Sequence, residues 1–126
     1  MIAPHDFMTN LLAEGLEGWN IRSGDRPLDG PLTRPTVAAY TTTVTNKPSV
    51  TRGVYATEVT VLVFPAETGK PDQYENDLFT ALTDVLGVLG ESPAITWSEA
   101  RRGIFNDRPA YQLTTTVYMT QKLGVE

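Results

Sequence analysis

The chain has 126 residues, of which 40% are hydrophobic and 20% are charged, with a formal net charge of −5 and no cysteine. This length and hydrophobicity suit one folded domain and exclude a disordered chain. The lack of cysteine excludes disulfides, thiol catalysis and thiolate metal sites, and the mild acidity without a basic face argues against nucleic-acid binding.

The first predicted element is a helix. Pro4 suits its first turn, Asp6 suits its positive end, and Gly15 and Gly18 mark its close. Its apolar residues recur at helical spacing and form one stripe: Phe7, Met8, Leu11, Leu12 and Leu16. We expect this helix to cover a sheet. The N-terminus lacks the basic and apolar regions of a signal peptide, and no apolar run approaches the ~20 residues that span a bilayer.

A short strand over residues 19–21 and a long loop are predicted next. Residues 23–35 are dense in Gly, Pro and Asp. A loop of this length often has a function of its own, and a plain connector is the alternative.

Two long strands follow, over residues 36–45 and 54–64. Both are rich in β-branched and aromatic residues. In the second strand one face carries Tyr55, Thr57, Val59, Val61 and Val63, and the other carries Ala56, Glu58, Thr60, Leu62 and Phe64. The linker over residues 46–53 is polar, with one Pro and one Gly. This pattern predicts an antiparallel hairpin.

A second helix is predicted from Asp72 onward. Glu75 stands three residues later as the reciprocal partner of a capping box. Gly90 suits a left-handed C-terminal cap, and Pro93 prevents continuation of the helix. The apolar positions have helical spacing: Tyr74, Leu78, Leu82, Val85, Leu86 and Leu89.

Two more strands close the chain, over residues 94–100 and 110–121, with a turn between them over residues 101–109. Pairs of strands interrupted by helices predict an α+β fold. We expect a single domain over residues 1–126, with a mixed or mainly antiparallel sheet of four to five strands and two helices packed on one face.

The sequence offers little that resembles an active site. His5 is the only histidine, and beside Asp6 it is interpreted as a solvated cap residue rather than as half of a catalytic dyad. Asp25 and Asp29 match no calcium-binding loop and suit turns better. No phosphate-binding glycine motif occurs. We therefore predict no catalytic, cofactor-binding or metal-binding residues, no cofactor and no enzymatic activity.

Basic residues flank two predicted turns. Arg101, Arg102 and Arg108 surround the last turn, where they suit either a phosphate or carboxylate clamp or, as we favour, a solvated hairpin end. Lys47 and Arg52 flank the tip of the first hairpin, and the same interpretations apply.

The strand faces expected to meet solvent carry Thr and Tyr in place of Lys and Glu. Natural edge strands are normally protected by charge, and uncharged strands with aromatic residues suit a subunit interface. The high β-propensity of Thr is the alternative explanation. The residues concerned are Tyr40, Thr41, Thr42, Thr43, Thr57, Thr60, Thr114, Thr115, Thr116, Tyr118 and Thr120. With the basic turns, they supply the candidate interface: Tyr40, Thr42, Lys47, Arg52, Arg101, Arg102, Arg108, Thr116 and Tyr118.

The order and length of these segments support a family resemblance over nearly the whole chain, although no invariant motif carries it. The segments are HDFMTNLLAEGL, GWNIRSGDRPLDGPLTRPTVAAY, TRGVYATEVTVLVF, DQYENDLFTALTDVLGVL and PAYQLTTTVYMTQ. In this arrangement the chain resembles the tail terminator, or tail completion, proteins of long-tailed bacteriophages.

This resemblance implies a structural protein of the virion. Such proteins form a ring, generally of six subunits, on the head-proximal end of the tail tube, where they stop tube growth and dock the tail on the head connector. The implied partners are further copies of this chain, the tail-tube protein and the head connector or stopper protein, and no membrane. DNA would pass through the lumen without specific binding, which the acidic balance suits. The implied location is the tail–head junction, after assembly in the host cytoplasm.

Three other functions remain open. The chain is also similar in size to neighbouring head–tail joining proteins. It suits a non-catalytic module that binds a protein or a small molecule, with the loop over residues 23–35 and the aromatic residues Trp19, Tyr40 and Trp97 lining a pocket. An enzyme that uses His5 is the least favoured.

Overall fold

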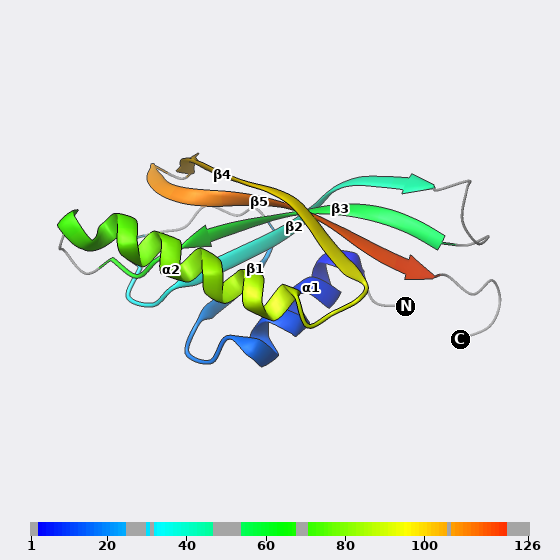
Figure 1. Cartoon of the computed structure of the whole chain (residues 1–126), viewed down its shortest axis with the longest axis horizontal. Coiled ribbons are helices and arrows are strands. Elements are labelled where there is room, and N and C mark those ends of the chain that lie inside the picture. The colour runs from blue at the N-terminus through cyan, green and yellow to red at the C-terminus, as the bar shows by residue number, and fades with distance from the viewer. Residues whose placement is uncertain are drawn as a thin grey trace.

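The computed structural model describes residues 3–24, 30, 32–46, 54–67, 71–105 and 107–120. Within them the chain forms two helices and five strands (Figure 1). In chain order these are α1 (Pro4–Gly15), β1 (Asn20–Ser23), β2 (Thr36–Asn46), β3 (Val54–Phe64), α2 (Pro71–Leu89), β4 (Ile95–Phe105) and β5 (Arg108–Thr120).

The strands form one sheet in the order β1-β2-β3-β5-β4. β1 pairs with β2 in parallel, and every other neighbouring pair is antiparallel. The predicted α+β class, the mixed sheet and the antiparallel β2–β3 hairpin are therefore confirmed. β1 and β4 are the edge strands.

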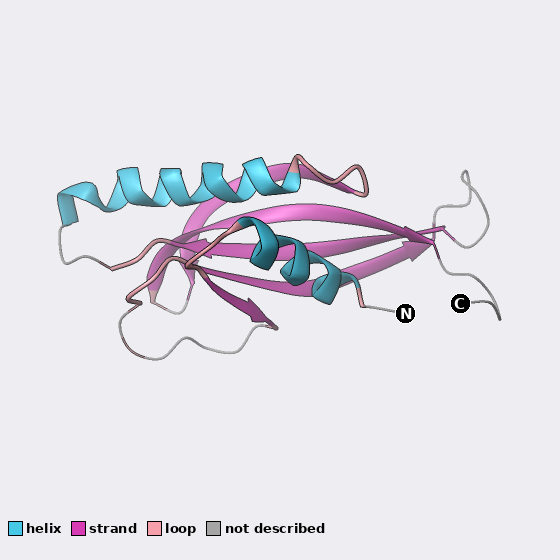
Figure 2. Ribbon diagram, turned by 90° about the horizontal axis from the view of Figure 1, so that it is seen from below, coloured by secondary structure: helices cyan, strands magenta, loops and turns pink. Residues whose placement is uncertain are grey.

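Both helices pack on the same face of the sheet (Figures 1 and 2). Successive residues of a strand point to opposite faces, so only alternate positions of β3 meet the helices. The buried residues on this side form the main core: Met8, Leu12, Leu16, Val37, Ala39, Val59, Val61, Val63, Ala81, Val85, Val88, Leu89, Ile95, Leu113 and Val117. We call this side the helix-bearing face. Burial of each large apolar side chain contributes about 1.5–3 kcal/mol, which makes this core the main source of stability.

The opposite side of the sheet, which we call the open face, carries a smaller apolar cluster at one end. Leu62 and Phe64 of β3 pack there with Leu32 and Ala110. The amide of Glu67 donates a hydrogen bond to the carbonyl of Leu32 (2.8 Å), which joins the chain after β3 to the chain before β2. Irregular segments therefore cover this end of the open face.

The first helix agrees with its prediction. It begins at Pro4, ends at Gly15, and is followed by Gly18 with a φ of +82°. Gly15 also has a packing role, because a Cβ atom at this position would lie 2.6 Å from Cγ2 of Val88 in α2. The two helices approach each other closely at this glycine.

The start of α2 differs from its prediction. The helix begins at Pro71, so Asp72 lies inside the first turn and is not the residue that precedes the helix. Glu75 forms an ion pair with Arg102 of β4. A Pro in the first turn is favourable because its missing N–H has no helical partner there, and this explains the earlier start.

The last turn is much shorter than predicted. β4 continues through Arg102 and Gly103 to Phe105, which pairs with Arg108 at the end of the ladder. Asp107 has a φ of +62°, a conformation that Asp tolerates better than most residues. The prediction of a turn from residue 101 was therefore wrong, and the hairpin reverses within two residues.

Candidate interaction surfaces

The strands β2, β3 and β5 extend past the end of the helical layer (Figures 1 and 2). Val44 of β2, Thr57 of β3 and Val117 of β5 are neighbours across the ladder at the base of this part, where Val117 still belongs to the main core, and pairing continues beyond them to the strand ends. Thr57 and Val117 are buried, whereas Val44 is 61% exposed. We call these parts of β2, β3 and β5 the three-strand extension. It leaves an apolar side chain in water on the helix-bearing side.

A β-bulge lies at the base of the three-strand extension. The register of β2 against β3 shifts between Thr41 and Thr43. The hydroxyl of Thr42 lies 3.0 Å from the carbonyl oxygen of Glu58 and 3.1 Å from its Oε1. A bulge bends its strand and increases the local twist, so Thr42 helps to set the direction of the extension.

The Thr-rich surface is divided between the two faces of the sheet. Thr57 and Thr115 lie on the helix-bearing face, where they are 2% and 0% exposed. The Thr115 hydroxyl donates a hydrogen bond to the carbonyl of Val59 (2.7 Å). The prediction that these two residues meet solvent was wrong, because strand residues alternate between faces and one face is packed against the helices. Thr60 lies on the open face and is also buried, at 5% exposed, so its predicted exposure was wrong too.

The aromatic members of the candidate interface do share the open face. Tyr40 is paired with Thr60, Thr116 with Glu58, and Tyr118 with Ala56. Tyr40 also packs against the smaller apolar cluster, and Tyr118 is 38% exposed.

Charged residues also belong to the open face. Glu58 lies beside Thr116, and Arg101 pairs with Gln112 across the ladder. Arg101 forms an exposed ion pair with Glu99 at 3.2 Å. The surface is therefore polar and carries charges of both signs, and it is not nearly uncharged.

The three arginines of the last hairpin do not form one clamp. Arg102 follows Arg101 on β4 and so points to the other face, where it pairs with Glu75 of α2. Arg108 lies on the neighbouring strand and has separate partners.

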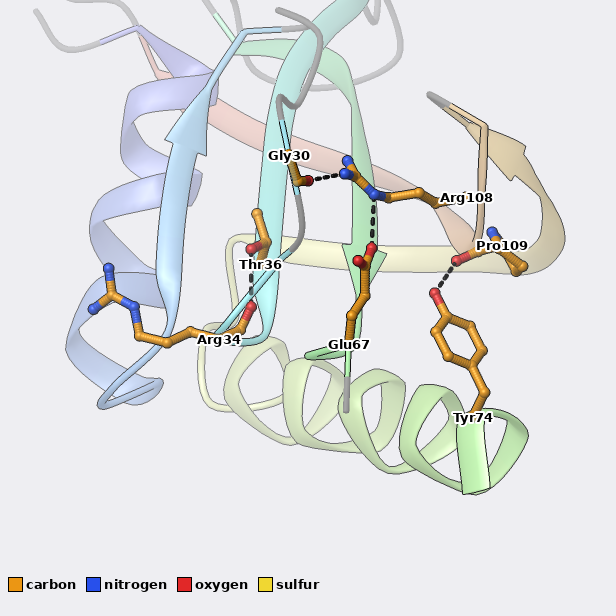
Figure 3. A network of polar contacts seen from close by, with 7 residues as sticks. All are labelled: Gly30, Arg34, Thr36, Glu67, Tyr74, Arg108 and Pro109. Atoms are coloured by element: carbon orange, nitrogen blue, oxygen red, sulfur yellow. Dashed lines mark hydrogen bonds and ion pairs between the residues drawn. The ribbon is translucent and has the colours of Figure 1, made fainter. Parts of the chain in front are cut away.

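Arg108 is an internal tie and not a solvated hairpin end (Figure 3). Its side chain is only 15% exposed, and its Nε lies 2.7 Å from Oε2 of Glu67. Its Nη2 also donates a hydrogen bond to the carbonyl of Gly30. The guanidinium thus joins the β4–β5 turn to the segments that precede β2 and follow β3.

Tyr74 makes a second tie at the same end of the sheet (Figure 3). Its hydroxyl donates a hydrogen bond to the carbonyl of Pro109 (2.9 Å), which attaches α2 to the start of β5. Burial and the negative charge of Glu67 raise the pKa of the Tyr74 hydroxyl above its ordinary value. The helical spacing of the sequence places Tyr74 in the apolar stripe, and no sequence signal predicts this contact.

His5 contacts the sheet and is more than a solvated cap. Its Nδ1 lies 3.0 Å from Oγ1 of Thr41, and its Nε2 lies 3.8 Å from Oδ1 of Asp6. The imidazole therefore links the first turn of α1 to β2. Lys47 and Arg52, the basic residues of the first hairpin tip, lie outside the described residues.

The edge strand β4 exposes two large apolar residues. Trp97 is 47% exposed and Ile104 is 64% exposed. The register against β5 shifts between Trp97 and Glu99, so a bulge interrupts this edge near its start.

The three aromatic residues proposed to line one pocket lie apart. Trp19 packs against the main core, Tyr40 against the cluster on the other face, and Trp97 belongs to the β4 edge. A pocket shared by them was therefore a wrong prediction. Trp19 instead contributes to a hollow of about 270 Å³. The hollow is lined by Trp19, Pro35, Pro65, Ala66, Asp77, Thr80, Ala81 and Asp84.

The comparisons with known proteins add no family. No protein-family model matches the chain, and no curated protein matches it.

Among the described residues, no group of three or more His or acidic side chains is placed to hold a metal ion. Neither described helix combines the length and apolar character needed to cross a bilayer.

Proposed function

We propose that this protein is a structural subunit that assembles into a ring, and that it acts as a tail terminator of a long-tailed bacteriophage. In this role the ring caps the tail tube, stops its growth and docks the tail on the head connector. The alternative is that it is another protein of the head–tail junction, since those proteins have a similar size.

The three-strand extension is the observation that carries this proposal. Stable domains cover a sheet with a second layer, because an uncovered sheet leaves apolar side chains in water. The strands here continue past their helices, and Val44 is exposed as a result. A neighbouring subunit would supply the missing layer.

The edge strand β4 offers a second contact region. A ring needs two different surfaces on each subunit, because its interfaces are head-to-tail. β4 forms the edge of the sheet opposite to β1, and it exposes Trp97 and Ile104 there. The charges of its Arg101 and Arg102 are already paired within the chain. The extension and the β4 edge therefore suit the two sides of one interface.

The charge balance suits a channel for DNA. The net charge is −5, and a surface that neutralises few phosphates binds DNA weakly. DNA then passes through the lumen without specific contacts. The location that follows is the tail–head junction of the virion.

The first test is the assembly state. Native mass spectrometry and light scattering over a wide range of protein concentrations should show a closed oligomer, most simply a hexamer, alone or after addition of purified bacteriophage tail tubes. Electron microscopy should place the oligomer at one end of each tube. A monomer under all of these conditions would contradict the proposal.

A pair of variants tests the extension itself. Val44→Glu places a charge on the exposed apolar side chain of the extension and should weaken assembly. Phe79→Glu is the matched control, because it places the same charge on an exposed apolar side chain of α2, outside both contact regions. Equal assembly of the two variants would remove the extension from the interface.

A second candidate function is a ligand-binding module. The hollow beside Trp19 favours it, and it is compatible with a structural subunit.

A further inference from the structure

The hollow beside Trp19 has walls of two kinds. Trp19, Pro35 and Pro65 give it apolar walls, and α2 gives it a polar wall. The backbone at Trp19 is fixed on both sides, since the backbone amide of Trp19 donates to the carbonyl of Leu16 (3.4 Å) and that of Asn20 donates to the carbonyl of Pro35 (2.9 Å). The tryptophan and the proline that face the hollow are therefore held together before any ligand arrives.

The polar wall carries two carboxylates. Asp77 and Asp84 are seven residues apart on α2, and therefore lie on one face of the helix about 10 Å apart along its axis. Thr80 lies between them on the same wall. None of the lining residues is basic. Neither carboxylate has an ion pair or hydrogen bond with a described residue, whereas Glu75 on the same helix pairs with Arg102.

We propose that this hollow binds an organic cation with an apolar stem, namely an arginine or lysine side chain. The carboxylates attract the cationic group, and the indole attracts it through its ring electrons. The prolines contact the methylene stem, as apolar surfaces do for long basic side chains. The volume of about 270 Å³ accepts a single side chain and lies below the usual range for drug-sized ligands.

This inference does not depend on ring formation. The hollow is built from residues of one subunit, away from the three-strand extension and from Trp97. A strictly monomeric protein would overturn the proposed function and leave this site intact.

Fluorescence of Trp19 provides the direct test. In the Trp97→Phe variant Trp19 is the only tryptophan, so titration with N-acetylarginine amide reports on the hollow alone. We expect saturable quenching, and about tenfold weaker binding of N-acetylcitrulline amide, which has nearly the same shape without the charge. Equal binding of the two compounds, or no saturable change with either, would overturn the proposal.

Matched variants separate the site from the overall charge. The double variant Asp77→Asn/Asp84→Asn should lose most of the binding. The control Glu14→Gln/Glu91→Gln removes the same number of charges at exposed positions outside the hollow, and should keep it. An equal loss in both would overturn the proposal, because bulk charge would then explain the attraction. Near-ultraviolet circular dichroism checks that both variants are folded.

A last comparison identifies the source of the side chain. The peptide Gly-Gly-Arg-Gly-Gly is titrated beside N-acetylarginine amide. Tighter binding of the peptide supports the site and assigns it to a side chain on a polypeptide. Equal binding supports the site and assigns it to the free compound. Failure of the peptide together with the amide overturns it.

Discussion

The guanidinium of Arg108 lies 2.7 Å from the carboxylate of Glu67, and it also donates to the carbonyl of Gly30 (Figure 3). These three residues belong to three segments that are far apart in the sequence. The pair is largely shielded, with side chains 15% and 29% exposed. An ion pair in this environment fixes the relative positions of its segments more effectively than an exposed pair does.

Arg108→Ala should therefore destabilise the protein. The variant leaves the carboxylate of Glu67 and the carbonyl of Gly30 without this donor in a partly buried place, and we expect a loss of about 2–3 kcal/mol. Urea denaturation followed by far-ultraviolet circular dichroism measures the change as a lower midpoint.

Arg101→Ala is the control for this measurement. Its ion pair with Glu99 joins side chains that are 73% and 55% exposed, so its removal should cost less than about 1 kcal/mol. Similar losses in the two variants would show that Arg108 contributes no more than a surface pair.

Tyr74→Phe tests the second tie. The variant removes the hydrogen bond to Pro109 and should cost about 1 kcal/mol at neutral pH. Urea denaturation at pH 7 measures this cost.

The effect of Tyr74→Phe should also depend on pH. The pKa of this hydroxyl in the folded protein is raised above the ordinary value of 10.0, mainly by burial and next by Glu67. The stabilisation is therefore complete below pH 10 and is lost as the pH rises through the higher folded value, because the unfolded chain releases the proton more readily. The difference between wild type and variant should shrink above pH 10. A constant or growing difference would contradict the assigned direction.

The sequence predicts the elements of this fold well, because each has a strong local signal. The apolar stripe from Phe7 to Leu16 and the Pro at position 4 define α1 within a residue. The two β-branched runs define β2 and β3. The single-residue shift at Pro71 and the longer β4 are errors of boundary, since local signals do not state where long-range pairing stops.

The candidate surfaces were harder to predict, since they depend on which side of the sheet the helices cover. Consecutive threonines such as Thr114 and Thr115 have the same side chain but lie on opposite faces of the sheet, where Thr115 is buried and Thr114 is half-buried. The long-range partners of Arg108 have no sequence signal, because Glu67 is 41 residues away. The seven-residue spacing of Asp77 and Asp84 predicts that they share one helix face, but only the fold shows that Trp19 lies beside this face.

The contact between α1 and α2 gives a further prediction. A Cβ atom at Gly15 would lie 2.6 Å and 2.7 Å from the two methyl carbons of Val88, which is buried in the core. Gly15→Ala should therefore destabilise the protein by about 1–2 kcal/mol, although alanine is the better helix former. Thermal and urea denaturation measure the loss of stability. The double variant Gly15→Ala/Val88→Ala should be less destabilised than the sum of the two single variants, because the smaller side chain at position 88 removes the clash.

Gly87→Ala is the matched control in the facing helix. Gly87 lies inside α2, and a Cβ atom there would meet nothing within 4 Å. The same substitution should raise stability by about 0.5–1 kcal/mol, because alanine loses less backbone entropy than glycine on helix formation. The two substitutions are expected to change stability in opposite directions, because only the Cβ atom at position 15 would clash with a neighbour. Stabilisation by both substitutions would mean that the helices do not approach at Gly15 as closely as the structure places them.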